Sequence, residues 1–155
     1  MGTGGRDHVG LLAGLRSDGS PVVEQVPARK LGEGLYLILG SPGLANGCAE
    51  GDTVAVDSDG AFEVSERGGN VAVHIYSGTT VAEPEAAELD RLLQPLRGKC
   101  ERHPQGRFAV ATIPVQAGFP AIESTMQAWA STGRDIEWFF GNVYADDGAP
   151  LNWWD

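Results

Sequence analysis

The second half of the chain repeats one pattern, a strand followed by a helix and another strand, and this limits the folds it can adopt. We predict strand, helix and strand over Val71–Ser77, Pro84–Leu96 and Phe108–Ile113, then a helix and a strand over Pro120–Ser131 and Ile136–Tyr144. Each helix opens with a proline, which the first helical turn tolerates. Each also carries apolar residues three and four positions apart, as expected of a helix with one buried face.

A short additional strand is expected at Lys99–His103, between the first helix and the strand at 108–113. The resulting order is strand, helix, strand, strand, helix, strand. This is the split βαβ, or ferredoxin-like, plan, in which two helices cover one face of an antiparallel sheet. We therefore predict a ferredoxin-like α+β sub-domain at residues 68–145.

The first 67 residues are rich in glycine and in short alternating segments, which is typical of antiparallel β structure. Strands are expected at Val9–Leu15, Val22–Val26, Leu35–Leu39, Thr53–Val56 and Ala61–Glu66. Ser41–Gly51 is expected to be a loop, because proline and glycine interrupt it. Short strands of this kind curl to cover one face. The predicted class is thus α+β, with a small barrel-like β sub-domain at 1–67 that forms one compact unit with the second half.

Charge and cysteine content narrow the classes of function. The 155 residues carry 21 acids and 11 Lys or Arg, a net charge of −10. No cluster of basic residues is available to bind a phosphate backbone, so we expect no nucleic acid partner. An anionic membrane would repel the chain, and no stretch approaches the ~20 apolar residues of a membrane helix. The two isolated cysteines, Cys48 and Cys100, fit a reducing compartment, so a cytoplasmic location is expected.

The sequence contains no recognisable catalytic, metal-binding or cofactor-binding motif. We therefore expect no metal, no cofactor and, on balance, no enzyme. His74 is the most interesting single residue, because strand alternation places it with Tyr76 on the sheet face opposite the helices. Phe139 or a neighbour would add an aromatic ring there. We expect the N-terminal β region to cover this face; the alternative is an open binding surface.

Three short segments resemble a known bacterial family. They are Gly34-Leu35-Tyr36, Ser41-Pro42-Gly43-Leu44 and Gly51-Asp52-Thr53-Val54. Together they resemble DUF4265, a domain of unknown function, over roughly Val9–Tyr144, although threonine stands at position 53 where the family signature has valine. The resemblance implies a small β region followed by a split βαβ module. It implies no activity.

The leading hypothesis is a non-enzymatic acidic module that binds a basic protein, as an immunity protein or an enzyme inhibitor does. The acids of the first helix or the acidic and aromatic tail at 146–155 would make the contacts: Glu83, Glu85, Glu88 and Asp90, or Asp146, Asp147, Trp153 and Trp154. For the two tryptophans we expect docking onto the chain's own sheet; the alternative is an exposed anchor for a partner.

The alternative hypothesis is a small-molecule site between the β region and the second sheet. Its candidates are Asp52, His74, Tyr76 and Cys100. A binding or catalytic site of this kind requires these side chains to converge on one concave pocket.

Overall fold

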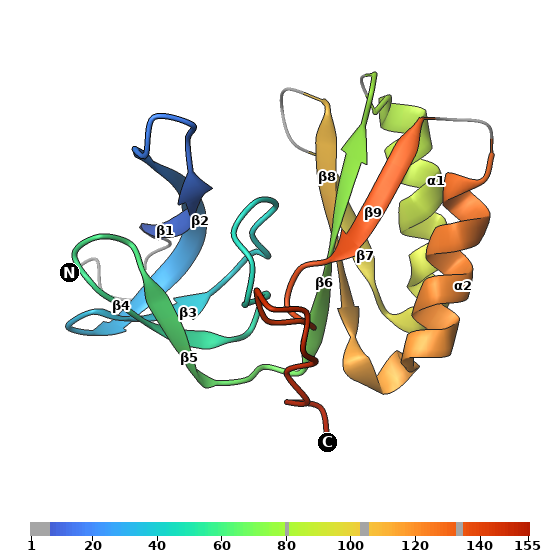
Figure 1. Cartoon of the computed structure of the whole chain (residues 1–155). Coiled ribbons are helices and arrows are strands. Elements are labelled where there is room, and N and C mark those ends of the chain that lie inside the picture. Colours follow the sequence, from blue (N-terminus) through green and yellow to red (C-terminus); the bar gives the residue numbers. More distant parts are fainter. Residues whose placement is uncertain (1–6, 80, 103–105, 133–134) are drawn as a thin grey trace.

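A computed structural model describes residues 7–79, 81–102, 106–132 and 135–155, which form two antiparallel sheets and two α-helices (Figure 1). The fold class is α+β, as predicted. In the first sheet the order is β1 (Asp7–Leu15), β2 (Pro21–Gly32), β3 (Leu35–Ile38), β4 (Thr53–Val56) and β5 (Phe62–Glu66). The second sheet has the order β7 (Lys99–Arg102), β8 (Phe108–Pro114), β6 (Asn70–Ser77) and β9 (Ile136–Phe140).

The first sheet is a meander in which each strand pairs with the next one along the chain. β2 is longer than the sequence pattern indicated, because its first half pairs with β1 and its second half continues onward to pair with β3. The sheet curls: the Leu12 N–H of β1 donates to the Gly60 carbonyl in the β4–β5 turn, at 2.8 Å. Alternate side chains meet inside the curl, where Leu11, Val26 and Ile38 are fully buried.

The second sheet has both helices on one face and the first sheet on the other (Figure 1). α1 spans Glu83–Leu93 and α2 spans Phe119–Ala130. The 3-10 turns Gln94–Leu96 and Val115–Ala117 follow α1 and β8. The first helix is therefore shorter than the predicted 84–96, since Pro95 cannot donate the backbone hydrogen bond that would continue it.

The helical face of the second sheet holds the larger core. The predicted stripe Ile122, Met126 and Trp129 of α2 is buried there, and it packs with leucines of α1 and with the alternate β6 residues facing the helices. The predicted strand at 99–103 is present up to Arg102; its last residue lies outside the described part of the chain. Among the described residues, no helix has the length and apolar character needed to cross a membrane.

Candidate functional site

The loop at residues 41–52 packs between the two sheets, and we call it the wedge loop. Ser41 Oγ lies 2.6 Å from Thr112 Oγ1 of β8, and the Gly47 N–H donates to the Gly141 carbonyl after β9 at 2.8 Å. Ala49 is fully buried in a small cluster with residues of β6 and β8. The face opposite the helices is thus covered by the N-terminal half, through this loop.

Two buried or half-buried carboxylates hold the wedge loop. Glu24 of β2 accepts the N–H groups of residues 43, 44 and 45 at 2.8, 3.0 and 2.9 Å. Asp52 accepts the N–H groups of Ala49 and Gly68 at 3.0 and 2.7 Å, and Arg67 lies 3.4 Å from its Oδ2 atom. Burial raises the pKa of Asp52, while these donors act in the opposite direction. Both carboxylates are committed to positioning the loop.

His74 lies beneath the wedge loop with only 3% of its surface exposed. Burial lowers its pKa, and the Glu24 charge and a hydrogen bond to the Pro42 backbone counteract this shift. Because proline has no N–H, the imidazole must be the donor in that bond. The other nitrogen, Nε2, is buried, has no hydrogen-bond partner among the described residues and packs against Gly141. His74 is therefore a half-satisfied core residue.

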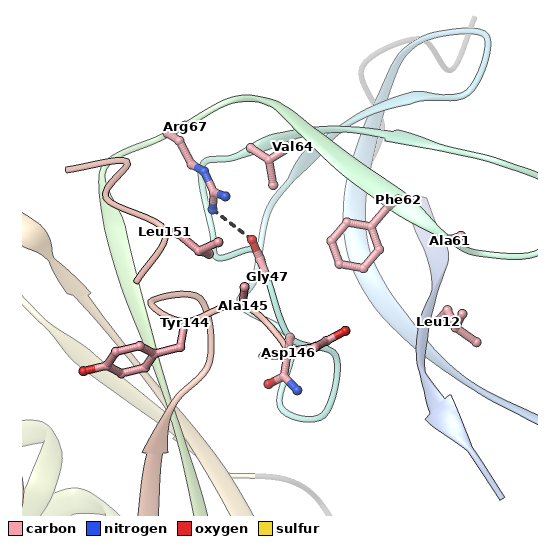
Figure 2. Close-up of a pocket in the computed structure, with 11 residues that line it drawn as sticks. Leu12, Gly47, Ala61, Phe62, Val64, Arg67, Tyr144, Ala145, Asp146 and Leu151 are labelled. Carbon is pink, nitrogen blue, oxygen red and sulfur yellow. Dashed lines mark hydrogen bonds between the residues drawn. The ribbon is translucent and has the colours of Figure 1, made fainter. Parts of the chain in front are cut away.

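Beside Asn46, in the middle of the wedge loop, two hollows meet and form what we call the inter-sheet groove. The first, of about 410 Å³, lies between Leu12 and Phe62 of the first sheet and Leu151 of the tail (Figure 2). The second, of about 360 Å³, reaches β6 and β9. The hollows share four lining residues: Asn46, Tyr144, Ala145 and Asp146. Arg67 lines the first hollow, with its guanidinium donating to the Gly47 carbonyl (Figure 2).

The second hollow, which we call the aromatic hollow, is walled by rings and glycine. Its lining residues are Asn46, His74, Tyr76, Phe139, Phe140, Gly141, Tyr144, Ala145 and Asp146. The rings of Tyr76 and Phe139 are 6.1 Å apart at a tilt of 54°. Phe139 and Tyr144 are 53% and 51% exposed, although both are large apolar side chains. Burial and the nearby Glu24 carboxylate raise the pKa of Tyr76, so its phenol stays neutral.

The four residues of the predicted small-molecule pocket do not converge. His74 and Tyr76 line the aromatic hollow, whereas Asp52 anchors the wedge loop. Cys100 packs against the helical core, where its N–H donates to Asp90, and burial with nearby carboxylates raises its pKa to about 12. The thiol is on the far side of the sheet because β7 turns that residue toward the helices. No group of three potential metal-ligating side chains occurs among the described residues.

The acids expected on the first helix differ in their surroundings. Glu85 accepts the Ala82 N–H at 3.1 Å at the start of α1, and Asp90 accepts the Cys100 N–H at 2.9 Å. Both carboxylates therefore already accept a hydrogen bond from a backbone N–H group. Glu83 is exposed and Glu88 is partly exposed.

The acids of the tail lie beside the inter-sheet groove. Asp146 is exposed, and its carboxylate makes no hydrogen bond or ion pair with any described residue. Asp147 accepts the Ala149 N–H through Oδ1 at 2.9 Å, in the turn that follows. Of the two, Asp146 lines both hollows and Asp147 lines neither.

The two terminal tryptophans dock onto the protein itself. The Trp153 indole N–H donates to the Asn142 carbonyl at 2.7 Å, and its ring lies 5.4 Å from the Arg67 guanidinium. The Trp154 and Phe119 rings are 5.0 Å apart in an edge-to-face arrangement. Both indoles are half-buried against the helical core, which withdraws much of their surface from any partner.

Two residues that line the groove, and a buried asparagine that supports it, were not identified from the sequence. Tyr144 and Asn46 carry no local motif, and only the meeting of distant segments makes them neighbours. Asn142 is fully buried and binds both the Ala72 N–H and the Asn70 carbonyl, 70 and 72 residues away. A lone asparagine after a strand gives no sequence signal of such a role. Phe139, by contrast, was expected on this face from strand alternation.

Comparison with known proteins places this architecture in a family. The chain is similar in fold to a hypothetical protein from Neisseria gonorrhoeae, whose crystal structure superimposes with a TM-score of 0.66 and 14% identity over 88% of this chain and 94% of that one. No curated protein matches significantly. The family described as Domain of unknown function (DUF4265) matches residues 24–136, from Glu24 through the wedge loop to the start of β9. This match spans more than half of the sequence, and the chain belongs to the DUF4265 family.

Proposed function

We propose that this chain is a protein-binding module that captures a segment of a basic partner in the inter-sheet groove. The observation that carries the proposal is Asp146, an exposed carboxylate that lines both hollows beside the half-exposed rings of Phe139 and Tyr144. Exposed aromatic residues around a concave surface are characteristic of protein contact sites. A carboxylate among them selects a cationic partner.

The overall charge supports the same class of partner. A net charge of −10 produces a negative field that attracts basic proteins and accelerates their encounter at low ionic strength. Helix α1 lies on the face of the second sheet away from the first sheet (Figure 1), and its exposed Glu83 adds to this field. We therefore assign the helix acids to steering and the groove to contact.

An immunity protein or an enzyme inhibitor is the biological role that this proposal favours, because each acts by occupying a surface of its target. We further propose that residues 68–145 are a ferredoxin-like split βαβ module, which the strand order β7-β8-β6-β9 supports. A cytoplasmic location remains part of the proposal, and the two free cysteines are consistent with it.

A small-molecule site is the second candidate, and one observation favours it. His74 and Tyr76 line the same hollow of about 360 Å³. The proposal is the weaker one, because Asp52 and Cys100 lie elsewhere and the described lining brings no nucleophile and base together.

Selection from a random peptide library displayed on phage tests the proposed function. We expect enrichment of peptides rich in Arg and Lys, whose affinity for the full chain falls as salt increases. Asp146→Asn and Tyr144→Ser should weaken the selected peptides, whereas Asp147→Asn should not. Asp147→Asn is a matched control, since it removes the same charge one position away and its amide oxygen can still accept the Ala149 N–H.

Two outcomes would overturn the proposal. One is enrichment of neutral or acidic peptides. The other is equal affinity of the selected basic peptides for the unchanged chain and for both groove variants.

A further inference from the structure

We propose that the aromatic hollow is a subsite for one arginine side chain of the partner. This inference rests on the proposed function and adds the chemical group that the groove recognises. It follows from the combination of rings, acceptors and charges that line the hollow.

The charges around the aromatic hollow all have one sign. No Lys or Arg is among its lining residues in the described part of the chain, and Asp146 supplies a carboxylate at its rim. Glu24 lies close enough to act electrostatically on both His74 and Tyr76: burial raises the pKa of Tyr76 and the Glu24 charge adds to this, whereas burial lowers the pKa of His74 and the Glu24 charge opposes it. Arg67, the basic residue of the neighbouring hollow, is already bound to Gly47 and Asp52. A cation entering the aromatic hollow therefore meets attraction without repulsion from the walls.

The walls are suited to a cation that is flat and partly apolar. The centroids of the tilted Tyr76 and Phe139 rings are 6.1 Å apart, and Tyr144, after β9, adds a third ring to the lining. A cation over the face of such rings is stabilised by their quadrupoles. Since Phe139 and Tyr144 are about half exposed, their faces remain accessible.

The acceptors of the hollow favour guanidinium over ammonium. The Asp146 carboxylate and the Asn46 amide oxygen belong to the lining, and so does the buried His74. The buried Nε2 of His74 packs against Gly141 and has almost no accessible surface, so the acceptors that a ligand can reach are those of Asp146 and Asn46. Arginine presents five donors in a plane that also stacks on rings, whereas the lysine ammonium is a compact, strongly hydrated charge.

Nuclear magnetic resonance of the full chain tests the subsite with two matched ligands. The probe is N-acetyl-arginine amide, and the control is N-acetyl-citrulline amide, which has nearly the same shape but no charge. We expect the arginine compound to shift the amide signals of Tyr76, Phe139 and Asp146 and to bind about fivefold more tightly than the citrulline compound. Asp146→Asn should weaken arginine binding about threefold, and Asp147→Asn should leave it unchanged.

The subsite is overturned if the two ligands bind equally, or if Asp146→Asn and Asp147→Asn have the same effect. It is also overturned if agmatine binds more tightly than every arginine-containing peptide, since the hollow would then serve a free small cation. Replacing each arginine of a selected basic peptide by citrulline separates this inference from the proposed function. Undiminished binding of that peptide to the groove would remove the arginine subsite and leave the proposed function standing. Failure to select any basic peptide would remove the proposed function.

Discussion

Asp52→Asn should destabilise the protein strongly, although it changes one oxygen to an NH₂ group. Oδ2 of Asp52 accepts the buried Ala49 N–H and Oδ1 accepts the Gly68 N–H. Whichever way the asparagine amide turns, its NH₂ therefore faces a backbone donor. One donor is left unsatisfied, at a cost of about 1–3 kcal/mol. Arg67 also loses its ionic partner, so the total is about 3 kcal/mol.

Asp57→Asn is the matched control, because one oxygen, Oδ1, accepts both the Asp59 and Ala61 N–H groups in an exposed turn. The asparagine oxygen can take over both bonds, so the expected change is within about 0.5 kcal/mol. Urea unfolding measures both variants. With a slope of about 2 kcal/mol per molar urea, Asp52→Asn should lower the midpoint by about 1.5 M. A loss for Asp52→Asn no larger than that for Asp57→Asn would refute this account of the wedge loop.

Three further results are expected. Gly141→Ala would place a methyl group 2.5 Å from His74 Nε2 and should lower the free energy of unfolding by about 1–3 kcal/mol in the same urea assay. In the control Gly32→Ala the added Cβ would meet nothing within 4 Å, so the loss should be less than about 0.5 kcal/mol. Burial lowers the pKa of His74, so below about pH 6.5 the unfolded chain binds a proton that the native protein does not. The free energy of unfolding should therefore fall as the pH decreases. In urea titrations repeated across this pH range, His74→Gln should make the free energy of unfolding less dependent on pH. Burial raises the pKa of both Cys48 and Cys100, and nearby carboxylates add to this effect at Cys100. Neither thiol should therefore react with iodoacetamide in the native protein at neutral pH. Rapid alkylation detected by mass spectrometry would contradict their placement.

Local signals were sufficient to predict most helices and strands. The stripe at Ile122, Met126 and Trp129 identified the buried face of α2, and alternation around His74 correctly separated the two faces of β6. These features depend on neighbours within a few residues. Helix α1 ends before the predicted Leu96, because Pro95 cannot donate the backbone hydrogen bond that would continue the helix.

The N-terminal half was expected to cover the face of the second sheet opposite the helices. The contacts that join the two sheets could not be predicted, because they are made between distant segments. The bond from Ser41 to Thr112 joins residues 71 positions apart, and the loop pattern around Ser41 specifies only a break in regular structure. The inter-sheet groove has the same origin, since Asn46 and Tyr144 are far apart in the sequence. Cys100 was a candidate for the small-molecule pocket, but the structure packs it against the helical core.

We propose that a basic partner binds in the inter-sheet groove, not on the acidic first helix. Amide chemical shifts of the full chain, recorded while a basic peptide from the phage selection is added, test this most directly. Binding in the inter-sheet groove should give the largest chemical-shift changes at Asn46, Phe139 and Asp146. Shifts that cluster instead on Glu83 and Glu88 of α1 would contradict it.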